Sequence, residues 1–327
     1  MKRRRLPATI GLLATLLVTG AGGAVAQADN YPVRPVKIIV SSGAGGAIDV
    51  LARVVADHLS RIWGQQVLVV NHPGGGTAIG VRAAATSVPD GYTLFYALTA
   101  SFVALPVLQP DLPFDVARDF VPIGLIGEQP MIIAVDPALG VNTLEELIAL
   151  SKKRPGGLTC AVPTSGSLPH VTGEWFRRRA GADLTFIHYP GTAQSVLDVI
   201  GGRVSMLIEA LPALAGAIAG GRLKPIAVAS RERLPSLGDV PTVTETVMGF
   251  VAMGWFALMA PPGTSPEITS KISEDLRKIL ELPELKRKFT ELGTIARPMS
   301  AAELTGFIRS EQELWSPVVR ALEAQRK

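Results

Sequence analysis

Cysteine is almost absent from this chain, in which Cys160 stands alone among 327 residues. A single thiol cannot form an intramolecular disulfide, so the fold must be stabilised by packed apolar cores. Cys160 lies in an apolar strand pattern with no candidate base beside it, which argues against a cysteine nucleophile. The G-x-S-x-G motif and the P-loop are both missing, and no two histidines have zinc-ligand spacing. A hydrolase is therefore only a weak alternative.

An excess of charge is also missing once the first residues are set aside. Four of the 32 basic residues lie at positions 2–5 and none of the 28 acidic residues precedes Asp29, which leaves 28 of each sign. No remaining basic run is longer than the triplet at 177–179, which fits a solvated helix face. A near-neutral chain of this kind is not expected to bind nucleic acid.

Long apolar runs are missing too, except at the amino terminus. There the basic residues precede the apolar stretch 10–18 and a set of small residues, which is the pattern of a cleavable secretory signal peptide. We expect a signal peptide at 1–26, with cleavage after Ala26 or after Ala28. A membrane helix is the competing interpretation, but the stretch is short and glycines interrupt its continuation. The mature protein is therefore expected to be exported.

Glycine, in contrast, is concentrated in two turns that each follow an apolar, β-branched segment. Residues 36–40 precede the turn 41–47, and residues 67–70 precede the turn 71–77. Glycine lets a backbone approach a ligand closely, and the N–H groups and dipole of a helix start favour an anion. Because neighbouring parallel strands end at one edge of a sheet, the two turns predict a crevice for a small anion.

Strand and helix patterns alternate through most of the chain, which predicts an α/β fold with mixed, mainly parallel sheets flanked by helices. The pattern starts again near residue 128, and the last strand is followed only by helices, as if the chain returned to the first sheet. We therefore expect two lobes joined by two crossings, near 126–129 and 250–255. Lobe 1 comprises 27–127 with 251–327, and lobe 2 comprises 128–250.

The elements expected near the crossings and the carboxyl terminus are short. Residues 120–126 and 132–135 are predicted as separate strands, and 255–259 as the last strand. The helix that follows the capping box at 300–303 is expected to be interrupted at Pro317.

Several ordered motifs along the chain are those of a known family. They include Gly45-Gly46-x-x-Asp49, Asn71-x-Pro73-Gly74-x-Gly76, Pro89-Asp90-Gly91-Tyr92-Thr93-Leu94, Pro169-His170, Asp239-Val240-Pro241-Thr242 and Ala260-Pro261-x-Gly263-Thr264. The chain resembles, over its whole mature length, the Bug family of tripartite tricarboxylate transporter substrate-binding proteins, also called TctC-like. The resemblance implies a periplasmic binding protein with a Venus flytrap fold, whose two lobes close on a small carboxylate without catalysis.

The resemblance also indicates partners. It implies delivery of the carboxylate to membrane subunits of a tripartite tricarboxylate transporter by a monomer that holds no cofactor and no metal. A sensing role, in which the liganded protein acts on a membrane sensor kinase, uses the same fold and stays open. A nucleotide-dependent enzyme is disfavoured, because Ile48 stands where a dinucleotide fingerprint needs its third glycine.

The resemblance places the ligand-binding residues on loops of both lobes. Lobe 1 is expected to contribute Ser42, Gly43, Gly45, Gly46, Asp49, Gly75, Gly76, Thr77, Thr99 and Ser101. Lobe 2 is expected to contribute Thr164, Ser165, Gly166, Ser167, His170, Tyr189, Gly191, Thr192 and Glu209.

Some of these positions allow two interpretations. Asp49 lies in the first turn of its helix, where a carboxylate is favoured by the dipole, so fixing the loop is favoured over ligand contact. His170 can point at the cleft or at the backbone of its own loop. Glu209 would repel an anion unless it were protonated or faced an amine, which makes it a candidate filter for ligand charge.

The chain departs from the family pattern in the second lobe. The family commonly has a small polar residue at Leu168, lysine at Pro190 and aspartate at Glu209. Leu168 and Pro190 have no side-chain donor for a second carboxylate, which would lose its hydration without gaining hydrogen bonds. These departures predict a preference for ligands with one carboxylate and an apolar distal part.

Overall fold

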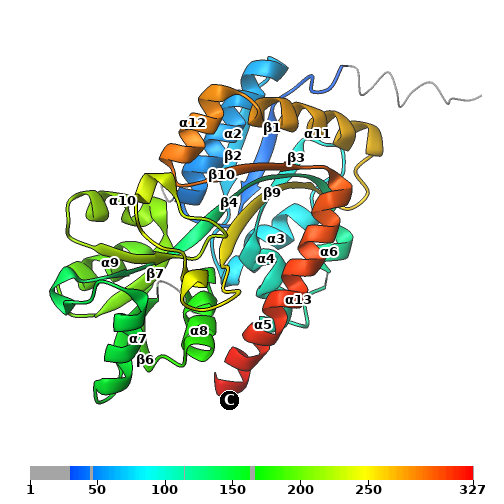
Figure 1. The fold of residues 1–327 in the computed structure, drawn as a ribbon. Coiled ribbons are helices and arrows are strands. Elements are labelled where there is room, and N and C mark those ends of the chain that lie inside the picture. The colour runs from blue at the N-terminus through cyan, green and yellow to red at the C-terminus, as the bar shows by residue number, and fades with distance from the viewer. Residues whose placement is uncertain (1–29, 45–46, 114, 163–165, 327) are drawn as a thin grey trace, which may run out of the picture.

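The protein folds into two lobes, each built on a β-sheet flanked by helices (Figure 1). The structure is a computed structural model that describes residues 30–44, 47–113, 115–162 and 166–326. The expected signal peptide and the expected site residues Gly45, Gly46, Thr164 and Ser165 lie outside these described residues. The predicted two-lobed α/β fold is confirmed.

The sheet of lobe 1 is mixed, with a parallel part and an antiparallel part. Its strands are β1 (Val36–Val40), β2 (Val67–Asn71), β3 (Thr93–Leu98), the first part of β4 (Val121–Val135), β9 (Met253–Ala260) and β10 (Ile295–Met299). Strand β1 pairs in parallel with β2 and β3. Strand β9 pairs antiparallel with β3 and β4, and β10 pairs antiparallel with β4. Val36, Ile38 and Val40 of β1 are completely buried, as expected for a parallel strand in a sheet that is covered by helices.

Helices cover both faces of this sheet. They are α2 (Ala47–Trp63), η1 (Gly75–Thr77), α3 (Ala78–Ala85), α4 (Thr99–Val103), α5 (Leu105–Leu108), α6 (Val116–Asp119), α11 (Pro266–Leu280), α12 (Pro283–Glu291) and α13 (Ala301–Arg326). One core lies under α2, α11 and α12, and a second lies under α3, α4 and the first half of α13. Ser265 caps α11 by accepting a hydrogen bond from the Ile268 amide, and Pro266 occupies the first helical position.

Lobe 2 repeats the strand-helix pattern around the second part of β4. Its other strands are β5 (Leu158–Val162), β6 (Leu184–His188), β7 (Met206–Ala210) and β8 (Lys224–Val228). Its helices are η2 (Pro137–Leu139), α7 (Leu144–Lys153), α8 (Leu168–Ala180), α9 (Thr192–Ile200), α10 (Leu211–Ala219), η3 (Pro235–Leu237) and η4 (Val243–Glu245). Strand β5 pairs in parallel with β6 and β7, whereas β7 and β8 pair antiparallel with β4.

Strand β4 runs without interruption through both sheets, so the prediction of two separate strands was wrong. Its residues up to Pro130 pair with β9 in lobe 1, and from Met131 onward it pairs with β7 and β8 in lobe 2. The return crossing lies beside it, where the Met131 amide donates to the Ala252 carbonyl at 3.1 Å. The predicted crossings are therefore hydrogen-bonded to each other, while the exact division of the chain into lobes stays a prediction.

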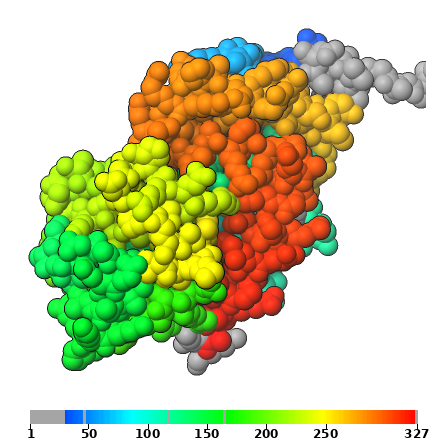
Figure 2. Space-filling view, in the orientation of Figure 1, coloured from blue at the N-terminus to red at the C-terminus, as the bar shows by residue number. Residues whose placement is uncertain are grey.

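Helix α13 spans both lobes and is continuous through Pro317, where an interruption was expected. Leu304 and Ile308 pack in a lobe 1 core, whereas Trp315 and Val319 pack in the lobe 2 core. Tertiary packing on both sides of the proline compensates for its missing N–H group. Figure 2 shows this segment, in red, directly against the second lobe, in green and yellow.

Gly80 in α3 sets the distance between that helix and the turn after β1. A Cβ atom at Gly80 would lie 2.8 Å from the Ser41 Cα and 3.1 Å from the His72 carbonyl oxygen. We expect Gly80→Ala to lower the free energy of unfolding by about 1–3 kcal/mol through overpacking. Gly306→Ala in α13 meets nothing within 4 Å, so better helix propensity is expected to raise stability by up to about 1 kcal/mol. Urea unfolding of both variants measures these changes. Equal changes in the free energy of unfolding would contradict the claim that Gly80 sets the distance between α3 and the turn after β1.

Candidate ligand-binding site

The strand directions bring the predicted loops of each lobe to one edge of its sheet. Strands β1, β2 and β3 are mutually parallel, so the turns that follow them lie together. Strands β5, β6 and β7 do the same in lobe 2. The two edges meet where α4 and α5 face the start of α8, because a Cβ at Gly166 would lie only 2.8 Å from the Leu108 Cδ1. The candidate site lies where these edges meet.

The turn after β2 has the backbone that the sequence predicts for close approach to a ligand. Gly74, Gly75 and Gly76 have φ values of 114°, 59° and 61°, in the region that favours glycine. Thr77 shares this region, with φ of 86°, and makes no side-chain capping bond at the start of α3. The Gln109 side-chain amide donates to the Gly75 carbonyl at 2.9 Å and ties the turn to the end of α5.

Buried hydroxyl groups without a hydrogen-bond partner gather on these loops. Of the seven such hydroxyl oxygens within the described residues, Tyr96 and Thr172 have one each, and the other five belong to Ser41, Ser42, Thr77, Ser101 and Ser167. All five follow the carboxyl ends of parallel strands, four in lobe 1 and one in lobe 2. A buried polar group left unpaired costs about 1–3 kcal/mol, so five together favour a polar ligand that pairs with them. Ser41 was missing from the expected set, although it adjoins Ser42 in the sequence.

Asp49 ties the turns after β1 and β2 together. Its carboxylate accepts hydrogen bonds from Arg53 Nε at 3.0 Å and from Asn71 Nδ2 at 2.9 Å. Asn71 Nδ2 also donates to the Ser42 carbonyl at 3.1 Å. These bonds agree with the interpretation that Asp49 fixes the loop.

The hydroxyl of Thr99 is engaged within the protein. Thr99 Oγ1 accepts a hydrogen bond from the Trp255 amide at 2.6 Å and donates to the Trp255 carbonyl at 3.3 Å. It therefore links α4 to β9, and ligand contact by this hydroxyl requires a different bonding pattern. Ser101, on the same short helix, is completely buried and has the free hydroxyl.

The loops of lobe 2 are held by bonds among the predicted residues. The Gly166 amide donates to His170 Nδ1 at 3.0 Å, so this histidine faces its own loop. Its ring also lies edge-to-face against the His188 ring, with 4.9 Å between centroids. The Tyr189 hydroxyl donates to Asp198 at 2.9 Å, and burial raises the pKa of this tyrosine.

Glu209 is buried at the end of β7. It accepts hydrogen bonds from the Thr192 hydroxyl at 2.9 Å and from the Ala210 amide at 2.8 Å. Burial raises the pKa of its carboxyl group, and the two hydrogen bonds oppose this effect. Thr192 and Gly191 stand at the start of α9, so the carboxylate lies near a helix amino terminus that stabilises its charge.

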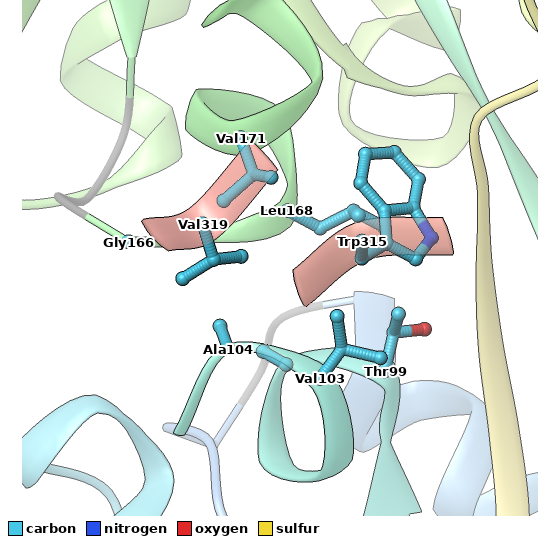
Figure 3. A pocket seen from close by; sticks show the side chains of 9 residues that line it. Thr99, Val103, Ala104, Gly166, Leu168, Val171, Trp315 and Val319 are labelled. Atoms are coloured by element: carbon cyan, nitrogen blue, oxygen red, sulfur yellow. The ribbon is translucent and has the colours of Figure 1, made fainter. Parts of the chain in front are cut away.

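A small apolar cavity lies beside the site, between α4, α8 and α13 (Figure 3). Leu168 and Val171 of α8 line it from lobe 2, and Val103 lines it from lobe 1. Trp315 and Val319 of α13 form its third wall. These α13 residues were not predicted, because nothing in the sequence near them signals that their helix reaches the second lobe.

The described residues contain no cluster of three or more His, Cys, Asp or Glu side chains that fits a metal ion. None of the helices in the described part is long and apolar enough to cross a membrane.

Residues 51–324 match the family described as the tripartite tricarboxylate transporter family receptor, or TctC. The chain belongs to this family. Its members are periplasmic substrate-binding receptors. Protein BugT of Bordetella pertussis is 36% identical over 329 residues, covering 100% of each chain. The resemblance read from the motifs is thereby confirmed.

Solved structures with bound carboxylates share the fold. The structure of R. palustris Rpa4515 with adipate has a TM-score of 0.82 and 29% identity, covering 89% of this chain and 97% of the other. MatC (Rpa3494) from Rhodopseudomonas palustris, with bound malate, has a TM-score of 0.78 and 26% identity, covering 88% of this chain and 100% of the other.

Removing the Asp49 carboxylate tests its role in positioning the loops. Asp49→Ala takes a buried acceptor away from the Asn71 amide and from the half-exposed Arg53 guanidinium, so we expect a loss of about 1–3 kcal/mol in stability. Asp57→Ala in the same helix breaks only an exposed pair with Arg61, which is worth at most about 0.5 kcal/mol. Chemical unfolding measures both variants. An equally small loss for both would show that Asp49 does not hold the turns.

Proposed function

We propose that this protein is a periplasmic solute-binding protein that captures a small carboxylate between its lobes and delivers it to a tripartite tricarboxylate-type membrane transporter. The observation that supports this most directly is the set of five unpartnered buried hydroxyls at the meeting edges of the two sheets. Family membership and the carboxylates bound by Rpa4515 and MatC support the ligand class. Delivery to a transporter, periplasmic export and a monomeric state rest on the family alone.

Hydroxyls and turn amides are sufficient for useful affinity. A hydrogen bond to a charged group contributes about 1.5–3 kcal/mol, and micromolar binding requires about 8 kcal/mol. Three or four such bonds therefore suffice for micromolar affinity, after the free-energy cost of ordering the ligand and the loops is subtracted. The protein needs no charged residue to hold the carboxylate, so the ligand can leave when the lobes separate.

We propose that the site binds without catalysis. His170 Nδ1 accepts a hydrogen bond from the Gly166 amide and so is engaged with its own loop. Membership of a receptor family supports binding without catalysis.

Ser101 gives a direct test of the carboxylate site. Ser101→Ala removes one free buried hydroxyl, so we expect carboxylate affinity to fall tenfold or more while stability is unchanged or slightly higher. Tyr96→Phe is the matched control, because its hydroxyl is also buried without a partner, but it lies in the lobe 1 core. Calorimetric titration with malate, adipate and benzoate measures the affinities. Equal affinities for Ser101→Ala and the unmodified protein would place the carboxylate elsewhere.

Leu168 tests ligand preference. Its side chain lines the apolar cavity, and its Cδ2 would lie 3.1 Å from a Cβ at Gly254 on the crossing strand. We propose that the protein prefers benzoate-like acids over citrate, and that Leu168→Ser raises citrate affinity by supplying a donor and space. Leu197→Ser, at an exposed position in α9, should change neither the affinity for citrate nor that for benzoate-like acids. Tight citrate binding by the unmodified protein, measured by calorimetry, would refute this preference.

A further inference from the structure

A buried carboxylate lies where the chain crosses between the lobes. The Glu128 side chain on β4 is only 3% exposed. Its Oε1 pairs with Arg297 Nη1 of β10 at 2.7 Å, and its Oε2 pairs with Arg231 Nη1 at 3.4 Å. Arg297 belongs to lobe 1, and Arg231 follows β8 in lobe 2. One carboxylate therefore holds an arginine from each lobe.

A second carboxylate, Glu311 of α13, lies close to this group. Its Oε2 accepts a hydrogen bond from the indole Nε1 of Trp315 at 3.2 Å. Glu311 stands between Ile308, which packs in lobe 1, and Trp315, which packs in lobe 2 against Trp175 with 5.0 Å between ring centroids. Trp315 is buried and Glu311 is partly buried, so separation of α13 from lobe 2 would expose the indole and increase the exposure of the Glu311 carboxylate to water.

Few other charges face Glu311. Helices α4 and α5 and strand β9 contain no charged residue. In α6, Arg118 and Asp119 pair with each other, and in α8, Glu174 pairs with Arg177. The groups that act on Glu311 are thus Glu128, which repels its negative charge, and Arg231, which attracts it. Arg297 is one ion pair further away, on Glu128.

We propose that Glu311 is a proton-binding site coupled to lobe closure, so that the closed protein takes up a proton that the open protein releases. This inference rests on the proposed function, because it assumes that ligand binding closes the lobes.

The electrostatics of the structure, in which the edges of the two lobes lie close together, agree with this coupling. Burial, with the Glu128 charge, raises the pKa of Glu311 from its ordinary 4.5 to about 6, against the lowering effects of Trp315 and Arg231. A raised carboxyl pKa penalises the closed state above pH 6, and the penalty disappears as pH falls through this value. With an ordinary pKa in the open state, ligand affinity is expected to rise about eightfold from pH 7.5 to pH 5.

The Trp315 indole provides a direct reporter of the proton. The chain has four tryptophans, so its indole ¹⁵N–¹H resonances can be followed individually and the Trp315 signal assigned with Trp315→Phe. With saturating adipate, we expect that signal to titrate with a midpoint near 6, and Glu311→Gln to abolish the titration. A Trp315 signal that does not move between pH 4.5 and 7.5, or that moves equally in Glu311→Gln, would overturn the proposal.

Affinity measurements test the coupling to closure. Calorimetry with malate, adipate and benzoate at pH 5 and 7.5 measures the affinity of Glu311→Gln divided by that of the unmodified protein. This affinity ratio should be about ten or more at pH 7.5 and severalfold smaller at pH 5. Protonation of the acids affects both proteins equally, so it does not change the ratio. Glu313→Gln, at an exposed position in the same helix, should behave like the unmodified protein.

The outcomes separate this inference from the proposed function. If the acids bind but the affinity ratio of Glu311→Gln to the unmodified protein is the same at both pH values, the coupling is contradicted and the receptor function is not. Failure of all three acids to bind would contradict the proposed carboxylate class. In the ligand-free protein the indole signal is expected to titrate near the ordinary carboxyl pKa of 4.5, and a midpoint near 6 without ligand would contradict the coupling to closure.

Discussion

The pairing of β4 with β9 is the constraint on which the arrangement of the two lobes depends. Both strands pass the crossing, and β4 supplies backbone partners to the sheets on either side. Because the sheets share this strand, their parallel strands end toward each other, and the loops that follow them meet. Thr99 strengthens the same region by bonding to both backbone groups of Trp255. The hinge and the binding loops are therefore parts of one hydrogen-bonded structure.

The unpartnered polar groups at the proposed anion site are neutral hydroxyls. The buried carboxylate of Asp49 is paired with Arg53 and hydrogen-bonded by Asn71, and that of Glu209 is hydrogen-bonded by Thr192 and the Ala210 amide. A group of ion pairs lies at the crossing, where Glu128 joins Arg231 and Arg297. Neutral donors bind an anion without a buried counter-charge, which would slow release. The proposed proton-binding residue, Glu311, interacts with the charges of Glu128 and Arg231 in this group.

Much of the fold could be predicted because strand patterns, glycine turns and helix caps are set by residues that are close together in the sequence. The segment Val36–Val40, the glycine turn before α3 and the capping box at 300–303 all occur as expected. Long-range packing explains what was missed. In the sequence, Gly127 suggests that the strand ends there. In the structure, a Cβ at Gly127 would lie 2.7 Å from the Ile295 carbonyl oxygen, so glycine permits the close approach of β10 to β4. Strand β10 itself is short and partly exposed, with no clear alternation, and was not expected.

The candidate site shows the same division. The chain order of turns and helix starts placed Ser42, Thr77, Ser101 and Ser167 correctly at the strand ends. The engagement of Thr99 with Trp255, a residue far away in the sequence, could not be predicted from either segment. The same holds for Trp315, which reaches lobe 2 only because α13 continues through Pro317.

The central claim is that a carboxylate closes two lobes that move relative to each other. Small-angle X-ray scattering of the mature protein, with and without a saturating carboxylate identified by thermal shift, tests it most directly. With ligand, the radius of gyration is expected to be smaller, and the scattering profile is expected to match the structure in Figure 1, in which the lobe edges lie close together. Identical profiles in the two states, with the ligand shown to be bound, would contradict it.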